Sequence, residues 1–503
     1  MNMNEWLPLA VLSSSLLPGL VIFALPEERV ALRTALNLAG ALAKLGLVAL
    51  LLAGVAAGEE YGFRYAVLPG LDLVFKADAL ALLFVTLSAV LWLFTTLYAI
   101  GYLERSPRRS RFFGFFSLCV TATMGIAMAG NLFTFFIFYE LLTLSTFPLV
   151  VHRGTAKALK GGTVYLAYTL VGGTVLLVGI VWLNSLLGHS EFVAGGVVAA
   201  LGGTHDAALK TIFLLLIAGV GVKAALVPLH GWLPQAMVAP APVSALLHAV
   251  AVVKAGAFGI VRIVYEVYGI EFAQSLGLLA PLAFLAAATI LWGSLRALMQ
   301  DDLKKRLAFS TVSQVSYIVL GVALFGPLGT IGGLVHLVHQ GVMKITLFFC
   351  AGNYAETLGL HKVSEMDGAG RRMPWTTAAF SIAALGMMGA PLTAGAVSKA
   401  WLVDGAEAAG MGWAAWVLWT SSLLNAAYFL PILWRAWARP RPAAWPHEHI
   451  PARGRRETAW LLLLPPLVTA LLTLAFGLFA EAEWSPLAWA KLIAQREYLQ
   501  TAF

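Results

Sequence analysis

Apolar runs of about twenty residues follow one another along nearly the whole chain, and a helix of that length crosses the hydrocarbon core of a bilayer. The pattern predicts an all-α integral membrane protein with about fourteen transmembrane helices. The predicted spans cover residues 5–26, 30–57, 77–103, 112–129, 131–151, 161–187, 208–229, 243–268, 274–299, 304–324, 329–357, 375–404, 412–436 and 458–479.

The segments between these runs alternate in charge. One set holds most of the lysines and arginines, including Arg105 to Arg111, residues 304–306 and the stretch from Arg435 to Arg456, whereas the other set, such as 188–210 and 405–411, holds few. The positive-inside rule places the basic set in the cytoplasm and both termini outside the cell membrane. An RNA-binding patch at 105–111 is the alternative, but topology already accounts for those arginines.

The composition agrees with a membrane protein. The chain has 503 residues, of which 60% are hydrophobic and 12% charged, whereas soluble proteins carry about a quarter charged residues. Its two cysteines, Cys119 and Cys350, lie inside apolar runs, which argues against a disulfide framework or a thiolate metal cluster. Because glycine-rich nucleotide motifs are also missing, we predict no cofactor. The acidic flank of residues 5–26 favours a first span over a removable signal peptide.

Two of the runs are interrupted by prolines. The segment 226–242 contains Pro228 and three further prolines, and the segment 386–395 contains Pro391 among glycines. Proline breaks helical hydrogen bonding, and broken helices at matching places in two halves are typical of inverted-repeat transporters. Ordinary proline kinks would give the same pattern.

We therefore predict four parts: helices at 1–103, a first inverted repeat at 112–268, a second at 274–436, and a last helix with a tail at 458–503.

Ionisable residues inside the first-half runs are informative, because a charge at the bilayer centre costs about 2.5–3.5 kcal/mol on insertion scales. Glu140 lies mid-span. It could be a proton carrier, a partner of a buried lysine or a protonated structural acid. Lys223 directly precedes the first break, where freed carbonyls could stabilise its ammonium; it could carry a proton or form a fixed pair with Glu140. Lys254 is mid-span among small residues, and we predict a relay site there. His248 fits a relay or a structural role equally well.

The second half carries a similar set. His336, Gln340 and Lys344 are spaced four residues apart and form a polar stripe on one helix face. His339 lies off the stripe, and a bis-histidine haem site would need a partner histidine that no other helix clearly offers. Lys399 follows the second break. It could be a relay site, or its side chain could snorkel towards the outer loop. A row dominated by lysine repels metal ions and supplies no nucleophile with a base, so it favours proton relay.

The chain resembles the antiporter-like membrane subunits of complex I and of Mrp-type cation/proton antiporters. The strongest match runs from Lys223 to His248, which reads KAALVPLHGWLPQAMVAPAPVSALLH, followed by Lys254. Further matches are Phe138 to Glu140 and the stretch from Asp301 to Gln314. The segment from Met343 to Gly352 looks closer to the D-type branch of the Mrp antiporter subunits.

This resemblance implies a fourteen-helix fold with two inverted five-helix repeats, broken seventh and twelfth helices and a central hydrophilic axis. It places the family's proton-translocating residues at Glu140, Lys223, Lys254, His336, Lys344 and Lys399, with His248, Pro228, Pro391 and Gln340 in support. Many relatives have histidine where this chain has Gln340, so the relay there would run through water or His336.

Three functions follow from the resemblance. The first is a proton-translocating subunit of a multisubunit Mrp-type antiporter, whose partners are other membrane subunits, lipid, protons and, through the complex, sodium. The second is a pumping subunit of a complex I-like NADH-quinone oxidoreductase or membrane-bound hydrogenase, with the redox sites on other chains. The third is the membrane subunit of an inorganic-carbon uptake pair. None of the three implies nucleic acid.

Overall fold

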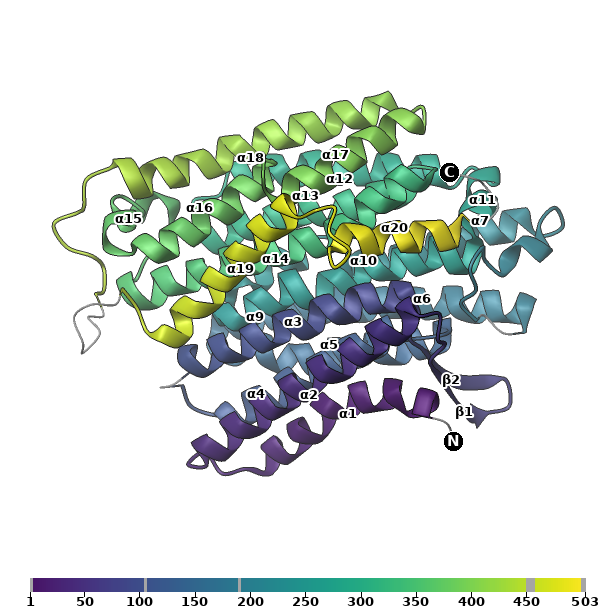
Figure 1. Cartoon of the computed structure of the whole chain (residues 1–503), viewed down its shortest axis with the longest axis horizontal. Coiled ribbons are helices and arrows are strands. Elements are labelled where there is room, and N and C mark those ends of the chain that lie inside the picture. Colours follow the sequence, from purple (N-terminus) through teal and green to yellow (C-terminus); the bar gives the residue numbers. More distant parts are fainter. Residues whose placement is uncertain (1–2, 104–105, 189–190, 449–456, 499–503) are drawn as a thin grey trace.

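The computed structural model describes residues 3–103, 106–188, 191–448 and 457–498. Its helices lie side by side in one elongated bundle (Figure 1), which confirms the predicted helical membrane fold. Helix α1 begins and helix α20 ends at the right-hand end of this view, which we call the terminal end; the opposite end is the loop end. Arg105 and residues 449–456 of the predicted basic segments lie outside the described residues.

The N-terminal part begins with two peripheral helices and a β-hairpin at the terminal end. Polar residues start the next helices: the side chains of Asp78, Asn131 and Thr155 accept hydrogen bonds from backbone N–H groups of the first turns of α3, α5 and α6. The elements are α1 (Met3–Ala24), α2 (Val30–Ala56), β1 (Gly62–Leu68), β2 (Leu71–Lys76), α3 (Ala79–Tyr102), α4 (Arg109–Ala127), α5 (Leu132–Val150), α6 (Ala156–Leu187) and η1 (Val198–Leu201).

The centre of the chain is irregular. A helix stops at Lys223, two short turns follow, and the next span contains two π-helical segments on either side of a regular helix. The elements are α7 (Asp206–Lys223), α8 (Trp232–Gln235), η2 (Ala236–Val238), α9 (Ala241–Ala245), the π-helix η3 (Leu246–Val250), α10 (Val252–Arg262), the π-helix η4 (Ile263–Tyr268) and α11 (Ile270–Ser275). Such π segments are frequent at functional sites.

The C-terminal part holds the longest buried helix, α14. The elements are α12 (Leu279–Leu298), α13 (Leu303–Ala323), α14 (Pro327–Leu358), η5 (Val363–Glu365), α15 (Ala369–Arg372), α16 (Pro374–Met388), α17 (Ala394–Ala408), α18 (Gly412–Ala438), α19 (Trp460–Leu478) and α20 (Pro486–Glu497).

The structure differs from the predicted spans in identifiable places. In the described part of the chain, twelve helices are long and apolar enough to cross a membrane. The two predicted spans that are absent from this set are the proline-interrupted ones: 208–229 stops at Lys223, and 375–404 is divided into α16 and α17. The hairpin and α20 were not predicted. The total of fourteen spans and the inverted repeats remain predictions.

The core lies along three elements. The most apolar windows of the span Ala241–Tyr268, of α13 and of α14 are entirely buried, whereas those of α1 and α2 are only 33% buried. Polar residues on the three central elements therefore face protein rather than lipid, and half of the predicted site residues are found there.

Candidate functional site

The break after α7 is closed by protein groups. The indole Nε1 of Trp232 donates to the carbonyl of Val222 at 2.7 Å, and the backbone N–H of Val227 donates to Thr289 Oγ1 at 3.1 Å. Groups that Pro228 and its neighbours remove from helical bonding are thus partnered inside the bundle, as non-helical backbone in a membrane requires. The break holds Lys223 at a helix end in the protein interior.

Lys223 is fully buried and contacts α5. Its Nζ donates to the backbone carbonyl of Tyr139 and lies 3.2 Å from the centroid of that residue's ring. Glu140 is the next residue, yet its carboxylate forms no ion pair with Lys223 within 4 Å; it packs instead against Gly173 of α6. The fixed Glu140–Lys223 pair considered from the sequence is therefore not formed in this structure.

Lys254 links the two halves of the chain. Its buried Nζ donates to the carbonyl of Leu337 on α14 at 2.8 Å. Two residues later, Gly256 lies directly against the end of α7: a Cβ there would be 2.1 Å from the backbone nitrogen of Ala224. The close approach at Gly256 brings the helices that carry Lys223 and Lys254 together.

The predicted stripe on α14 is fully buried. His336 Nδ1 and Ser398 Oγ of α17 are 2.8 Å apart, and the His336 ring stacks on Tyr317 with centroids 5.0 Å apart. Both side-chain polar atoms of Gln340 lack a protein hydrogen-bond partner. His339, which lies off the stripe, stacks on Phe476 of α19. The stripe thus faces the protein interior.

A chain of hydrogen bonds joins Lys344 to Lys399, and the sequence analysis did not foresee it. Lys344 Nζ donates to Ser310 Oγ at 2.6 Å, and this hydroxyl is 2.8 Å from Tyr428 Oη. Tyr428 donates to Asn425, whose amide donates to the carbonyl of Met387 at 3.1 Å. Lys399 donates to that same carbonyl at 2.8 Å.

Lys399 is anchored at the second break. Besides the Met387 carbonyl, its Nζ contacts the carbonyl of Met388 at 3.2 Å and Ser422 Oγ at 2.9 Å. These carbonyls end α16 just before Pro391, so the groups freed by the break hold the ammonium. This geometry does not support the snorkelling alternative.

His248 lies in the π-helix η3 and is fully buried. Its ring stacks on Phe348 with centroids 4.4 Å apart, and neither ring nitrogen has a protein partner. The stacking fits a structural role, whereas the unpartnered nitrogens fit a relay, so both alternatives remain.

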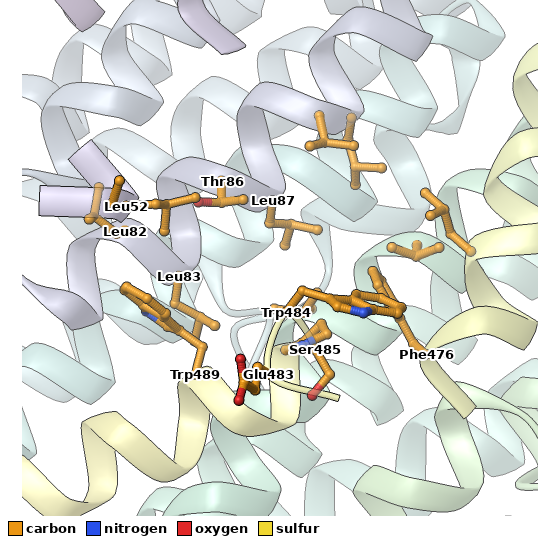
Figure 2. A pocket seen from close by; sticks show the side chains of 17 residues that line it. Leu52, Leu82, Leu83, Thr86, Leu87, Phe476, Glu483, Trp484, Ser485 and Trp489 are labelled. Carbon is orange, nitrogen blue, oxygen red and sulfur yellow. The ribbon is translucent and has the colours of Figure 1, made fainter. Parts of the chain in front are cut away.

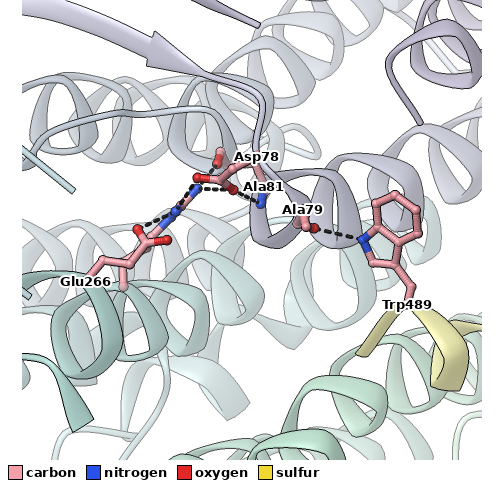
Figure 3. A network of polar contacts seen from close by, with 7 residues as sticks. Asp78, Ala79, Ala81, Glu266 and Trp489 are labelled. Atoms are coloured by element: carbon pink, nitrogen blue, oxygen red, sulfur yellow. Dashed lines mark hydrogen bonds and ion pairs between the residues drawn. The ribbon is translucent and has the colours of Figure 1, made fainter. Parts of the chain in front are cut away.

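Other buried charges also escaped the sequence analysis. Lys44 of α2 is fully buried, donates to Ser15 Oγ at 2.6 Å and lies 4.8 Å from the Trp92 ring centroid. A single lysine in the apolar run 30–57 was the available signal. At the terminal end, Arg262 binds Asp78 at 2.9 Å and also Glu266 (Figure 3).

Comparison with known proteins gives two family matches. Residues 129–425 match the model described as NADH:quinone oxidoreductase/Mrp antiporter, TM. Residues 70–113 match the model described as NADH-Ubiquinone oxidoreductase (complex I), chain 5 N-terminus. The first match covers more than half of the chain.

Individual relatives cover most or nearly all of the chain. The N-type subunit of NADH-quinone oxidoreductase from Desulforudis audaxviator is 34% identical over 95% of this chain and 97% of the relative. The D-type subunit of the Na(+)/H(+) antiporter from Bacillus subtilis is 27% identical over 81% of each. A chain of the Mrp complex from Dietzia sp. DQ12-45-1b superimposes with a TM-score of 0.85 at 26% identity, over 99% of this chain and 98% of that one.

Proposed function

This chain belongs to the NADH:quinone oxidoreductase/Mrp antiporter transmembrane family, and we propose that it moves protons as a subunit of a multisubunit Mrp-type cation/proton antiporter. The observation that carries the proposal is the buried series of amines from Lys223 to Lys399. Lys223 and Lys399 lie at the two helix breaks, and Lys254 contacts α14, the helix that carries Lys344. The partners of this chain are other membrane subunits of the complex. The complex lies in the cell membrane, and the terminal end of this chain faces the outside of the cell.

Glu140 controls the first step. In this structure Lys223 is bonded to the carbonyl of Tyr139 rather than to Glu140, so this step requires the carboxylate to approach the amine. A carboxylate and an ammonium at 4 Å attract each other by about 4 kcal/mol at an effective dielectric of 20. One charge crossing 100 mV changes in energy by about 2.3 kcal/mol. Movement of Glu140 is therefore enough to decide whether Lys223 holds its proton.

The proton then passes to Lys254 and on to α14. Gln340 and His248 present buried polar atoms without protein partners, and buried polar groups of this kind bind ordered water. Water at these positions, with His336, completes the route to Lys344. The hydroxyls of Ser310 and Tyr428 continue it towards Lys399.

The test is proton transport by the assembled complex in inverted membrane vesicles. Lys223→Met and Glu140→Gln should each lower the rate by about tenfold or more. Lys44→Met is the matched control, because it removes an equally buried lysine outside the series. Full-rate transport by normally assembled Lys223→Met and Glu140→Gln complexes would contradict the proposal.

A second candidate is the pumping subunit of a complex I-like oxidoreductase. It is favoured by the 34% identity to the N-type subunit of NADH-quinone oxidoreductase over nearly the full length of both chains. Purification in mild detergent separates the two: only small membrane subunits are expected with an Mrp-type complex, and redox subunits with a complex I-like one.

A further inference from the structure

Tyr139 of α5 contacts α7 at two points. Its hydroxyl donates to the carbonyl of Gly219 at 3.1 Å, one helical turn before Lys223. Its own carbonyl accepts a hydrogen bond from Lys223 Nζ, and the same Nζ lies 3.2 Å from the centroid of the tyrosine ring. The side chain of Tyr139 is fully buried. We call this place, between the ring and the carbonyl of Tyr139, the aromatic position of the amine.

Packing fixes the ring in this orientation. It stacks on Phe135, one turn earlier on α5, with centroids 5.6 Å apart. Phe135 in turn lies against α10, because a Cβ at Gly259 would be 2.8 Å from the end of its ring. Tyr139 is thus enclosed between the helices that carry Lys223 and Lys254.

Glu140 follows Tyr139 in the chain but faces another helix. Successive residues of an α-helix are about 100° apart around its axis, so the two side chains leave α5 in different directions. The Glu140 carboxylate lies against Gly173 of α6, and its Oε1 has no hydrogen-bond partner among the described residues. It is close enough to attract the Lys223 ammonium electrostatically. This carboxylate therefore offers the amine a second position.

An apolar cavity of about 400 Å³ lies elsewhere in the bundle (Figure 2). Its walls come from α2, α3, α14, α19 and residues 483–489, and none of its lining residues belongs to α5 or α7. Water or a ligand in this cavity would not touch Lys223. The cavity therefore offers the amine no third position.

The aromatic position favours a charged amine without a counter-ion. The face of an aromatic ring carries negative charge density that attracts a cation, and a carbonyl oxygen accepts from the N–H groups of an ammonium. Neither group carries a net charge, so the attraction is weaker than that of a carboxylate. An ammonium held here is not tied to an opposite charge.

We propose that Tyr139 is a positioning residue, which holds protonated Lys223 away from Glu140 and ready to pass its proton towards Lys254. The amine alternates between the carboxylate and the aromatic position. At the aromatic position one N–H bond of the ammonium breaks, the proton moves towards the amine of Lys254, and Lys223 is left neutral. The transfer rests on the proposed function, whereas the two positions of the amine do not.

Transport by the assembled complex in inverted membrane vesicles tests the ring. Tyr139→Leu should lower the rate by about tenfold, which corresponds to about 1.4 kcal/mol and lies within the range of a desolvated cation–π contact. Tyr139→Phe keeps the ring and should retain most of the rate. Equal rates in the two variants, whether high or low, would overturn the role of the ring.

Tyr268 is the matched control. It is also fully buried, and its hydroxyl donates at 2.6 Å to the carbonyl of Leu209, near the other end of α7. Its ring contacts Phe213 of α7 rather than an amine. Tyr268→Leu removes a similar contact with α7 and should retain most of the rate. A loss as large as that of Tyr139→Leu would show that transport responds to any loosening of α7, and would also overturn the proposal.

A cryo-electron microscopy structure of the Tyr139→Leu complex tests the two positions directly. Without the ring, Lys223 Nζ should lie within about 4 Å of a Glu140 oxygen, as in an ion pair. An amine that still occupies the carbonyl at position 139 would overturn the inference. This measurement does not depend on transport, so a wild-type complex that moved no protons would contradict the proposed function alone.

Discussion

Lys254 of α10 donates a hydrogen bond of 2.8 Å to the carbonyl of Leu337 on α14, one residue after His336. The contact joins the helix that follows the first break to the long helix that leads to the second. The proposed relay uses a lysine at this point because its amine reaches another helix and a lysine amine can lose and regain a proton.

Replacement of Lys254 by methionine should stop proton movement between the halves. Lys254→Met keeps the length and apolar stem of the side chain, so the fold should persist, whereas transport should fall by about tenfold or more. Lys254→Arg should not restore it, because a guanidinium does not release its proton. Proton uptake by inverted vesicles, compared at equal complex content, measures the effect.

The hydroxyl bridge between Lys344 and Tyr428 makes a second prediction. Ser310→Ala removes the oxygen that lies 2.6 Å from Lys344 and 2.8 Å from Tyr428. Transport should fall by about tenfold or more, because a hydrogen bond to a charged group contributes about 1.5–3 kcal/mol. Ser316→Ala on the same helix is the control, because Ser316 donates only to the carbonyl of Val312. Equal rates for the two variants would remove Ser310 from the route.

Gly256 gives a test of helix proximity. In Gly256→Ala the new Cβ would be 2.1 Å from the nitrogen of Ala224, and backbone cannot move aside as a side chain can. Overpacking of this kind costs about 1–3 kcal/mol, so α10 should shift away from α7 and the Lys223–Lys254 step should slow. Vesicle transport and the melting temperature of the purified complex should both fall. A normal rate would show that this approach is not needed.

The sequence predicted the features that depend on local composition. Apolar runs located the helices, and prolines located both of the breaks beside Lys223 and Lys399. The predicted amines are indeed buried. A charge in an apolar run is costly in lipid, so it faces the interior of the helix bundle.

The sequence did not predict contacts between distant helices. Nothing local shows that Tyr428 and Ser310 meet, or that Lys223 binds a carbonyl rather than Glu140. Helix α20 was missed because it is short and mixed in polarity.

The buried triad at the terminal end gives a prediction about stability rather than transport. The Arg262 guanidinium binds Asp78 and Glu266 and donates to the carbonyl of Ala127 at 3.1 Å. Its side chain is only 1% exposed. Removal of one member of a buried ion network leaves uncompensated charge and costs about 3–5 kcal/mol, so Arg262→Met should lower the melting temperature of the purified complex.

The matched control for this prediction is Arg64→Met. Arg64 also binds two carboxylates, Asp72 and Glu191, but its side chain is 52% exposed, and exposed pairs contribute only about 0–1 kcal/mol. Its loss should hardly change the melting temperature. Equal melting temperatures for the two variants would mean that water screens Arg262 as well as it screens Arg64. The triad would then not stabilise the contact between α3 and the end of α10. A large decrease in melting temperature for Arg262→Met alone would establish that the triad stabilises that end of the bundle.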